Sequence, residues 1–208
     1  MNTVFDTLLA GLRAMSPAEL ASVLLGAVYL VLAVRRSRWC WVAGGISSAI
    51  MIWLSAQARL PMQALLNVYY VVVSVYAWWR WTGQEARIPA VSLLPLRWHV
   101  MGVAGVVLAS LVTARWLAAE TQAAWPMLDS LTTWGSLFTT WLVARAKLEN
   151  WAYWLLIDAV EACLFFEQHL YLVSLMTFAT LGVILVGQRS WWRAWRHDGG
   201  VRVAQAGV

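Results

Sequence analysis

Two carboxylates and two indoles share one face of an apolar segment in the second half of the chain. Trp151, Trp154, Asp158 and Glu161 follow one another at steps of three, four and three residues. Because each residue of an α-helix turns about 100°, these side chains lie on one stripe. An indole face attracts a cation, and a carboxylate beside it would strengthen that attraction. An acid–base pair is the other chemistry available, but no electrophile-binding group is identifiable beside it.

The composition places this stripe in a membrane. Of the 208 residues, 62% are hydrophobic and 12% are charged, whereas an average soluble domain has about 25% charged residues. The chain also holds sixteen tryptophans, a residue that favours the boundary between lipid headgroups and hydrocarbon. A carboxylate at membrane depth costs about 2.5–3.5 kcal/mol on insertion scales. We therefore expect the stripe to face a polar interior.

Seven apolar runs have the length of a transmembrane helix, which is about 20 residues. They lie at 18–34, 39–56, 61–81, 98–118, 127–144, 151–170 and 171–191. The pattern predicts an all-α integral membrane protein with seven transmembrane helices. The opening MNTVFDTLLAGLRAM has an acid and no basic n-region, so we interpret it as an amphipathic segment at the interface.

Basic residues are distributed unequally between the two sides of these spans. Twelve Lys and Arg residues fall on one side and three on the other. The positive-inside rule then predicts a multi-pass protein of the cell (inner) membrane, with the N-terminus outside and the C-terminus in the cytoplasm. The tail RSWWRAWRHDGG is interpreted as an anchor at the membrane edge. The net charge of +5 is thus assigned to lipid and not to nucleic acid.

The spacing of several residues indicates an internal duplication. A shift of 111 positions places Arg36 on Lys147 and Ser47 on Asp158. Because one extra crossing separates the two three-helix units, both have the same orientation. The sequence therefore predicts a parallel 3+1+3 repeat bundle with its substrate site where the repeats meet.

We expect a single membrane domain over 1–208. Its predicted parts are repeat one at about 17–81, a linker helix at about 98–118 and repeat two at about 127–195.

Polar stripes on other spans predict a shared central cavity. The stripes consist of Glu19, Ser22, Gly26 and Tyr29; of Asn67, Tyr70, Ser74, Trp78 and Trp81; and of Asp129, Thr132, Thr133, Ser136 and Thr140. The alternative for the hydroxyls is interhelical bonding, and for the two end acids it is helix capping or pairing with an arginine. The alternative for Asp158 is a structural hydrogen bond across the bundle. Five tryptophans are assigned to the headgroup belt: Trp78, Trp81, Trp191, Trp192 and Trp195.

Cysteine and histidine give no sign of a metal site. Cys40 and Cys163 lie within or beside spans, and we interpret them as small packing residues. His99, His169 and His197 have no ligand spacing. We predict no metal and no cofactor.

Two stretches of the chain resemble the PnuC nicotinamide riboside transporter family. The run "ENWAYWLLID" is similar to the family's Glu-Asn-Trp-x-x-Trp-x-x-x-Asn element, and "LDS" is similar to its acid-Ser start of span five. The stretch "QARLPMQALLNVYYVVVSVYAWWRW" is similar to the first half. The resemblance covers roughly 17–196.

This resemblance implies a bundle similar to the SWEET transporters and a facilitator, not an enzyme. Such a protein passes a vitamin precursor down its gradient, and a cytoplasmic kinase traps the product. The second Trp and the Asn of the family element contact the ligand; Trp154 and Asp158 occupy those positions here, so an acid replaces an amide. Asn67 takes the place of a Gln, and Ser74 stands where an Asn is common.

The first prediction for the cargo is nicotinamide riboside, and the alternatives are thiamine or another heterocyclic vitamin or nucleoside. Nicotinamide riboside and thiamine are flat cations, which an ionised Asp158 would favour over a neutral flavin. The predicted substrate-binding residues are Trp154, Asp158, Asn67, Trp151, Gln168, Glu161, Tyr70 and Ser74. Remote alternatives are a polytopic membrane enzyme and a scaffolding subunit. A homo-oligomer is compatible with the pattern.

Overall fold

Seven helices account for most of the chain. The computed structural model describes residue 13 and residues 15–58, 61–82, 90–120, 125–167 and 171–206. Within these ranges the chain forms α-helices and no strand: α2 (Pro17–Val34), α3 (Trp39–Gln57), α4 (Pro61–Thr82), α5 (Leu96–Glu120), α6 (Pro126–Ala144), α7 (Asn150–Glu167) and α8 (Tyr171–Ala206). The predicted all-α fold and its seven helices are confirmed. The predicted interfacial segment before Pro17 lies almost wholly outside the described residues.

The helices differ in how apolar they are. Helices α2, α3 and α5 and the part of α8 at Val173–His197 are long and apolar enough to cross a membrane. Helices α4, α6 and α7 are less apolar because they carry most of the predicted polar residues. We conclude that this is an all-α membrane protein.

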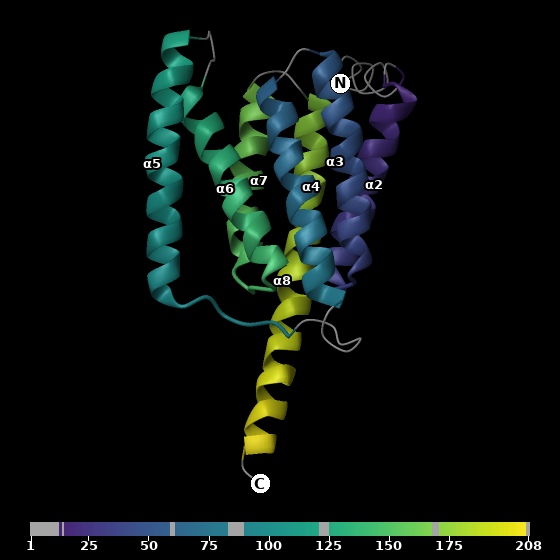
Figure 1. Ribbon diagram of the computed structural model, residues 1–208, viewed down its shortest axis with the longest axis vertical. Coiled ribbons are helices and arrows are strands. Elements are labelled where there is room, and N and C mark those ends of the chain that lie inside the picture. Colours follow the sequence, from purple (N-terminus) through teal and green to yellow (C-terminus); the bar gives the residue numbers. More distant parts are fainter. Residues whose placement is uncertain are drawn as a thin grey trace.

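Six of the helices form a closed ring. Going round it, α2 packs on α3, α3 on α4, α4 on α6, α6 on α7, α7 on α8, and α8 returns to α2. Helix α5 stands outside the ring and packs on α6 (Figure 1). The two consecutive triplets, α2–α4 and α6–α8, therefore meet along two seams, α2 with α8 and α4 with α6.

The turns that follow α2 and α6 have the same backbone form. Arg36 and Ala146 both have positive φ angles, 56° and 51°. The Arg36 N–H donates to the Ala33 carbonyl and the Ala146 N–H to the Val143 carbonyl, both at 2.9 Å. These equivalent residues stand 110 positions apart, so the shift of 111 taken from the sequence is displaced by one. We propose that the two triplets are repeats with this offset.

Two tryptophans link the triplets at these turns. The Trp81 Nε1–H on α4 donates to the Ala144 carbonyl at the end of α6, at 3.0 Å. The Trp191 Nε1–H on α8 donates to the Ala33 carbonyl near the end of α2, also at 3.0 Å. Both side chains are buried, with 3% and 0% exposure. Their assignment to the headgroup belt was therefore wrong, because each indole closes a seam of the ring.

Each of these tryptophans packs edge-on against a tryptophan of the central helix in its own triplet. The ring centroids of Trp41 and Trp81 are 5.4 Å apart, and those of Trp151 and Trp191 are 5.6 Å apart. These four indoles belong to one buried cluster. The other tryptophans assigned to the belt are at least partly exposed: Trp78, Trp192 and Trp195.

Helix α8 is longer than each of the other six helices. Its 36 residues span about 54 Å at 1.5 Å per residue, against about 30 Å for the hydrocarbon of a bilayer. Its C-terminal part extends past the turns at one end of the ring (Figure 1).

Candidate functional site

Two adjoining cavities lie inside the ring. Their volumes are about 280 Å³ and about 190 Å³. Both are lined by Gly26, Tyr29 and Trp154, which marks where they meet. The residues that line them come from all six ring helices, so the site exists only when both triplets are assembled. Ligand sites are typically concave and largely apolar, with a few well-placed polar groups.

The larger cavity combines aromatic rings with neutral polar groups. Four rings contribute to its wall: Tyr29, Trp41, Tyr70 and Trp154. The polar lining consists of Ser47, Ser48, Asn67, Ser74 and Thr140. Gly44 allows one of these rings to come close, because a Cβ atom at this position would lie 2.9 Å from the Tyr29 ring. This wall could hold a flat ring by stacking and bond to hydroxyls at its edge.

The smaller cavity contains the carboxylate. Asp158 lines it together with Trp151, Trp154 and Thr180. The Thr180 hydroxyl on α8 donates to Asp158 Oδ2 at 2.6 Å. It also lies 2.7 Å from the Thr177 carbonyl oxygen, which competes for the same proton. Asp158 thus makes a hydrogen bond across the bundle, which was the alternative to ligand binding considered for it, and it also lines the cavity.

Three buried polar atoms at these walls have no hydrogen-bond partner among the described atoms. They are Nε1 of Trp41 at the larger cavity, and Nε1 of Trp151 and Oδ1 of Asn150 at the smaller one. An unsatisfied buried polar group costs about 1–3 kcal/mol.

Most of the predicted binding residues come together here. Asn67, Tyr70 and Ser74 line the larger cavity, and Trp151 and Asp158 line the smaller one. Trp154, which borders both, joins the two groups. The Asn67 amide also donates to the Gln63 carbonyl of its own helix at 2.8 Å.

The remaining two predicted residues are placed differently. Glu161 lines neither cavity, but it is partly buried and interacts electrostatically with Asp158 and Tyr70. The Glu161 carboxylate therefore contributes to the electrostatic potential at the site, although it does not line either cavity. Gln168 lies outside the described residues.

Two residues of the predicted stripe on α2 have structural roles, and the other two line the cavities. Glu19 and Ser16 form a capping box at the start of α2: the Ser16 N–H donates to Glu19 Oε2 at 2.6 Å, and the Glu19 N–H donates to Ser16 Oγ at 3.2 Å. Ser22 accepts a hydrogen bond from the Ser47 hydroxyl at its carbonyl oxygen, at 2.9 Å. Only Gly26 and Tyr29 of this stripe line the cavities.

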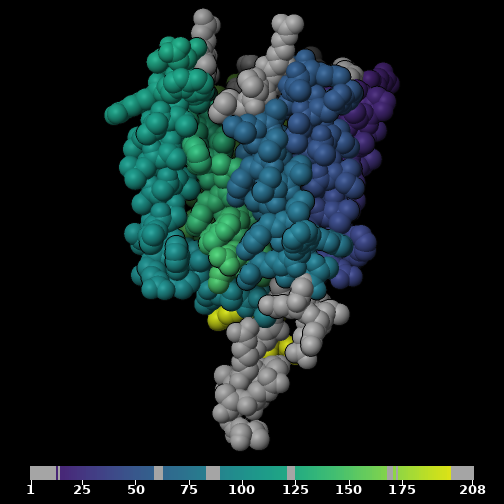
Figure 2. All heavy atoms as spheres, viewed as in Figure 1, coloured from purple at the N-terminus to yellow at the C-terminus, as the bar shows by residue number. Residues whose placement is uncertain are grey.

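The predicted stripe on α6 does not face one place either. Thr140 lines the larger central cavity. Asp129 and Thr133 instead line a separate cavity of about 400 Å³ between α4, α5 and α6, three helices that appear side by side in Figure 2. The expectation that the whole stripe borders one chamber was wrong, because α5 covers part of α6.

Sequence reasoning missed several lining residues, among them Trp41, Ser48 and Thr180. The first two could have been found with the offset of 110, which pairs Trp41 with Trp151 and Ser48 with Asp158. The shift of 111 moves both pairs out of register. The offset of 110 also pairs Thr180 with Tyr70, but the bond from Thr180 to Asp158 depends on how α7 packs on α8.

A metal centre is not indicated in the described part of the chain. No group of three or more His, Cys, Asp or Glu side chains is close enough there to hold an ion. Among the same residues, Cys40 and Cys163 are free thiols.

A ring of helices around a chamber of aromatic and polar side chains is the arrangement of a membrane protein that transports small molecules. The chain belongs to the nicotinamide mononucleotide transporter family, whose family model matches residues 16–193. This confirms the resemblance noted from the sequence.

Named relatives share most of its length. The chain is 26% identical to the riboflavin/roseoflavin transporter RibM of Streptomyces davaonensis, over 87% of each protein. It is 24% identical to the nicotinamide riboside transporter PnuC of Escherichia coli, over 69% of this chain and 71% of that one. The crystal structure of the vitamin B3 transporter PnuC has a similar fold, with a TM-score of 0.66, 22% identity and coverage of 87% of this chain and 82% of that chain.

Proposed function

We propose that this protein is a facilitator that carries nicotinamide riboside across the membrane. The observation that carries the proposal is that the Asp158 carboxylate and the indoles of Trp151 and Trp154 border one cavity. The nicotinamide ring of this cargo is a flat cation, and a cation over an indole face gains about 0.5–2 kcal/mol. The neutral polar wall around Asn67 and Ser74 suits the hydroxyls of a ribose.

Riboflavin is the second candidate, and a specific observation favours it. The similarity to RibM extends over a larger share of the chain than the similarity to Escherichia coli PnuC. A flavin is flat but uncharged, so it would use the aromatic wall and gain nothing from an ionised Asp158. Thiamine, another flat cation, would depend on Asp158 as nicotinamide riboside does.

The mechanism that fits this architecture is alternating access. The two triplets meet only along two seams among the described helices, and the cavities lie between them. Rocking of one triplet against the other would open the chamber to each side in turn. We expect no coupling to an ion or a nucleotide, so a cytoplasmic kinase that phosphorylates the cargo would make uptake irreversible.

The proposal is tested by uptake of labelled nicotinamide riboside, thiamine and riboflavin into liposomes that contain the purified protein. Asp158→Ala removes the carboxylate, whereas Asp158→Asn would restore the amide of the family element. If the cargo is a cation, the alanine variant should take it up about tenfold less well at limiting concentration. Asp129→Ala is the matched control, because Asp129 is also an acid within a helix but lines a different cavity.

Three results would decide between the candidates. Uptake of nicotinamide riboside that falls in Asp158→Ala and not in Asp129→Ala supports the first proposal. Riboflavin uptake that is unchanged in both variants favours the second. Absence of uptake for all three compounds would contradict a role in vitamin transport.

A further inference from the structure

A short segment is fixed against the turn between α6 and α7. Residues 90–95, which we call the strap, lead into α5. The Ser92 N–H donates to the Ala146 carbonyl at 3.1 Å, and the Leu148 N–H donates to the Ser92 carbonyl at 3.1 Å. The Leu94 N–H donates to Glu149 Oε1 at 2.8 Å. Together these hydrogen bonds fix the position of the strap, so the fold itself defines the space beside it.

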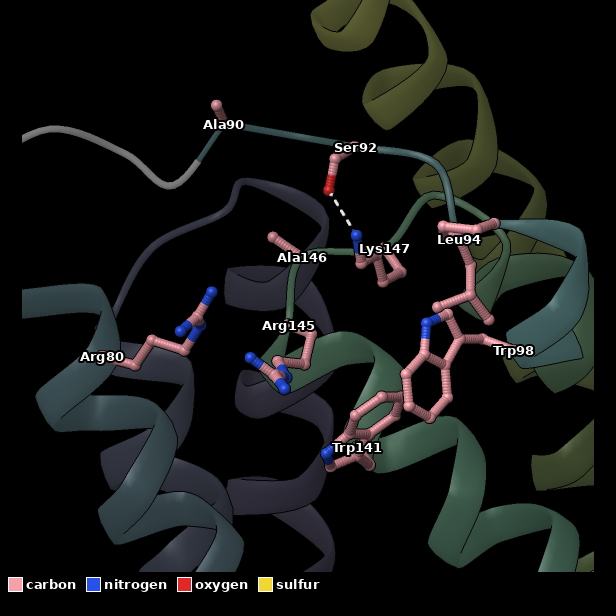
Figure 3. A pocket seen from close by; sticks show the side chains of 10 residues that line it. Arg80, Ala90, Ser92, Leu94, Trp98, Trp141, Arg145, Ala146 and Lys147 are labelled. Atoms are coloured by element: carbon pink, nitrogen blue, oxygen red, sulfur yellow. Dashed lines mark hydrogen bonds between the residues drawn. The ribbon is translucent and has the colours of Figure 1, made fainter. Parts of the chain in front are cut away.

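That space is a pocket of about 570 Å³ with three cationic side chains in its wall, Arg80, Arg145 and Lys147. They come from the end of α4 and from the turn after α6. Figure 3 shows the Lys147 amine directed at Ser92, with the guanidinium groups of Arg80 and Arg145 on the same side of the strap. The amine donates to Ser92 Oγ at 2.9 Å. Trp98 and Trp141 also line the pocket (Figure 3), and the Arg145 guanidinium lies over the Trp141 ring, 5.2 Å from its centroid.

The charges of this pocket are not balanced by acids in the part of the chain that the structure describes. None of the three cations there lies within 4.0 Å of a carboxylate, and the nearby Glu149 is 3.6 Å from His99 Nε2 instead. Desolvation lowers the pKa of Lys147. The nearby Arg145 and Arg80 lower this pKa further, and Glu149 opposes the shift. The surroundings therefore disfavour the positive charge of Lys147. A bound anion would stabilise that charge.

We propose that the pocket bounded by the strap, Arg80, Arg145 and Lys147 binds a phosphate group, carried either by a soluble phosphate ester or by the headgroup of an anionic phospholipid. Arginine and lysine are the side chains that bind phosphate in proteins, arginine through its fork of N–H donors. Basic pockets beside membrane helices suit lipid headgroups. A soluble phosphate ester with a flat ring would in addition find the Trp98 and Trp141 indoles.

The proposal can be tested at one amine, because Lys147 is the only lysine of the chain. Reductive methylation with isotope-labelled formaldehyde keeps its charge and gives one lysine signal in NMR spectra, beside that of the N-terminal amine. One arm adds inorganic phosphate or glycerol 3-phosphate to protein in phosphatidylcholine nanodiscs. The other arm replaces part of the phosphatidylcholine with phosphatidic acid. Binding should shift the lysine signal and raise its pKa, while the N-terminal signal serves as the reference.

The double variant Arg80→Gln/Arg145→Gln should weaken the response by about tenfold or more. Arg35→Gln is the matched control, since Arg35 caps α2 as Arg145 caps α6 but lines no cavity described above. A response to the soluble probes alone identifies a phosphate ester, and a response to phosphatidic acid alone identifies a lipid headgroup. No response in either arm, or an equal response in the double variant, overturns the proposal.

Discussion

Asp158 has partners of two kinds. One is the Thr180 hydroxyl on the neighbouring helix, and the other is the cavity that it shares with Trp151 and Trp154. A carboxylate inside a membrane protein needs hydrogen bonds to offset the loss of water. Thr180 supplies one and fixes the direction of the group, which leaves the other carboxylate oxygen for a cationic guest.

Replacing the Thr180 hydroxyl should therefore weaken binding of a cationic cargo. Thr180→Val keeps the shape and removes the donor, so we expect about tenfold weaker binding of nicotinamide riboside, measured by quenching of tryptophan fluorescence. Thr177→Val is the control, because the hydroxyl of this half-buried residue bonds to the Val173 carbonyl of its own helix, at 3.0 Å. Equal losses in both variants would show that the bond to Asp158 has no special role.

Gly26 offers a way to fill the site without disturbing its walls. A Cβ atom at Gly26 would meet only Ser47 Oγ, at 3.9 Å, and the residue borders both cavities. Gly26→Leu should reduce liposome uptake at least about tenfold, because its side chain would occupy space needed by a ligand in a pocket of this kind. Gly105→Leu on α5, where nothing lies within 4 Å of the added atom, should transport normally. Full uptake by the Gly26 variant would place the route elsewhere.

At the scale of the elements, the two triplets are joined by matching indole bonds. Each bond runs from a tryptophan on the last helix of one triplet to a carbonyl at the end of the first helix of the other. These carbonyls belong to the last turn of a helix, where backbone acceptors lack partners within the helix. The Trp81 indole supplies a donor to the Ala144 carbonyl, and the Trp191 indole adds a second donor to the Ala33 carbonyl, which also accepts from the Arg36 N–H. Together the two indoles close both seams.

Trp81→Phe and Trp191→Phe should each lower stability in detergent by about 1 kcal/mol, since each removes a buried hydrogen bond between the triplets. Thermal unfolding should show a lower Tm for both. Trp192→Phe serves as the control, because that side chain is 41% exposed. A Tm that falls equally in the control would mean that the loss is unrelated to the seams.

At the scale of the molecule, the turns after α2 and α6, the strap and the end of α8 all lie at one end of the ring (Figure 1). This end carries Arg35, Arg36, Arg80, Arg145 and Lys147. Cytoplasmic loops of membrane proteins are enriched in Lys and Arg, so we keep the prediction that this end faces the cytoplasm.

That orientation predicts the behaviour of reporters fused to the chain. Green fluorescent protein at the C-terminus should fluoresce in cells, whereas alkaline phosphatase at the same position should be inactive. The same two reporters fused at the N-terminus provide the comparison and should give the opposite pattern. Active phosphatase at the C-terminus would reverse the assignment.

The sequence alone was sufficient for the features that depend on local pattern. Apolar runs of about 20 residues define the helices because each must satisfy its own backbone hydrogen bonds in lipid. The steps of three and four residues likewise placed Trp151, Trp154 and Asp158 on one face of α7, and the structure puts all three at one cavity. Nicotinamide riboside as cargo stays a prediction.

Only the tertiary structure decided which polar faces meet. Glu19 and Asp129 stand at equivalent places near the starts of α2 and α6, yet one caps its helix and the other lines a cavity beside α5. Trp81 and Trp192 look alike in the sequence, but the first is buried at a seam and the second is exposed. The bond from Thr180 to Asp158 and the pinning of the strap on the turn after α6 join residues more than twenty positions apart. Such contacts depend on how the ring closes, and helical periodicity carries no information about that closure.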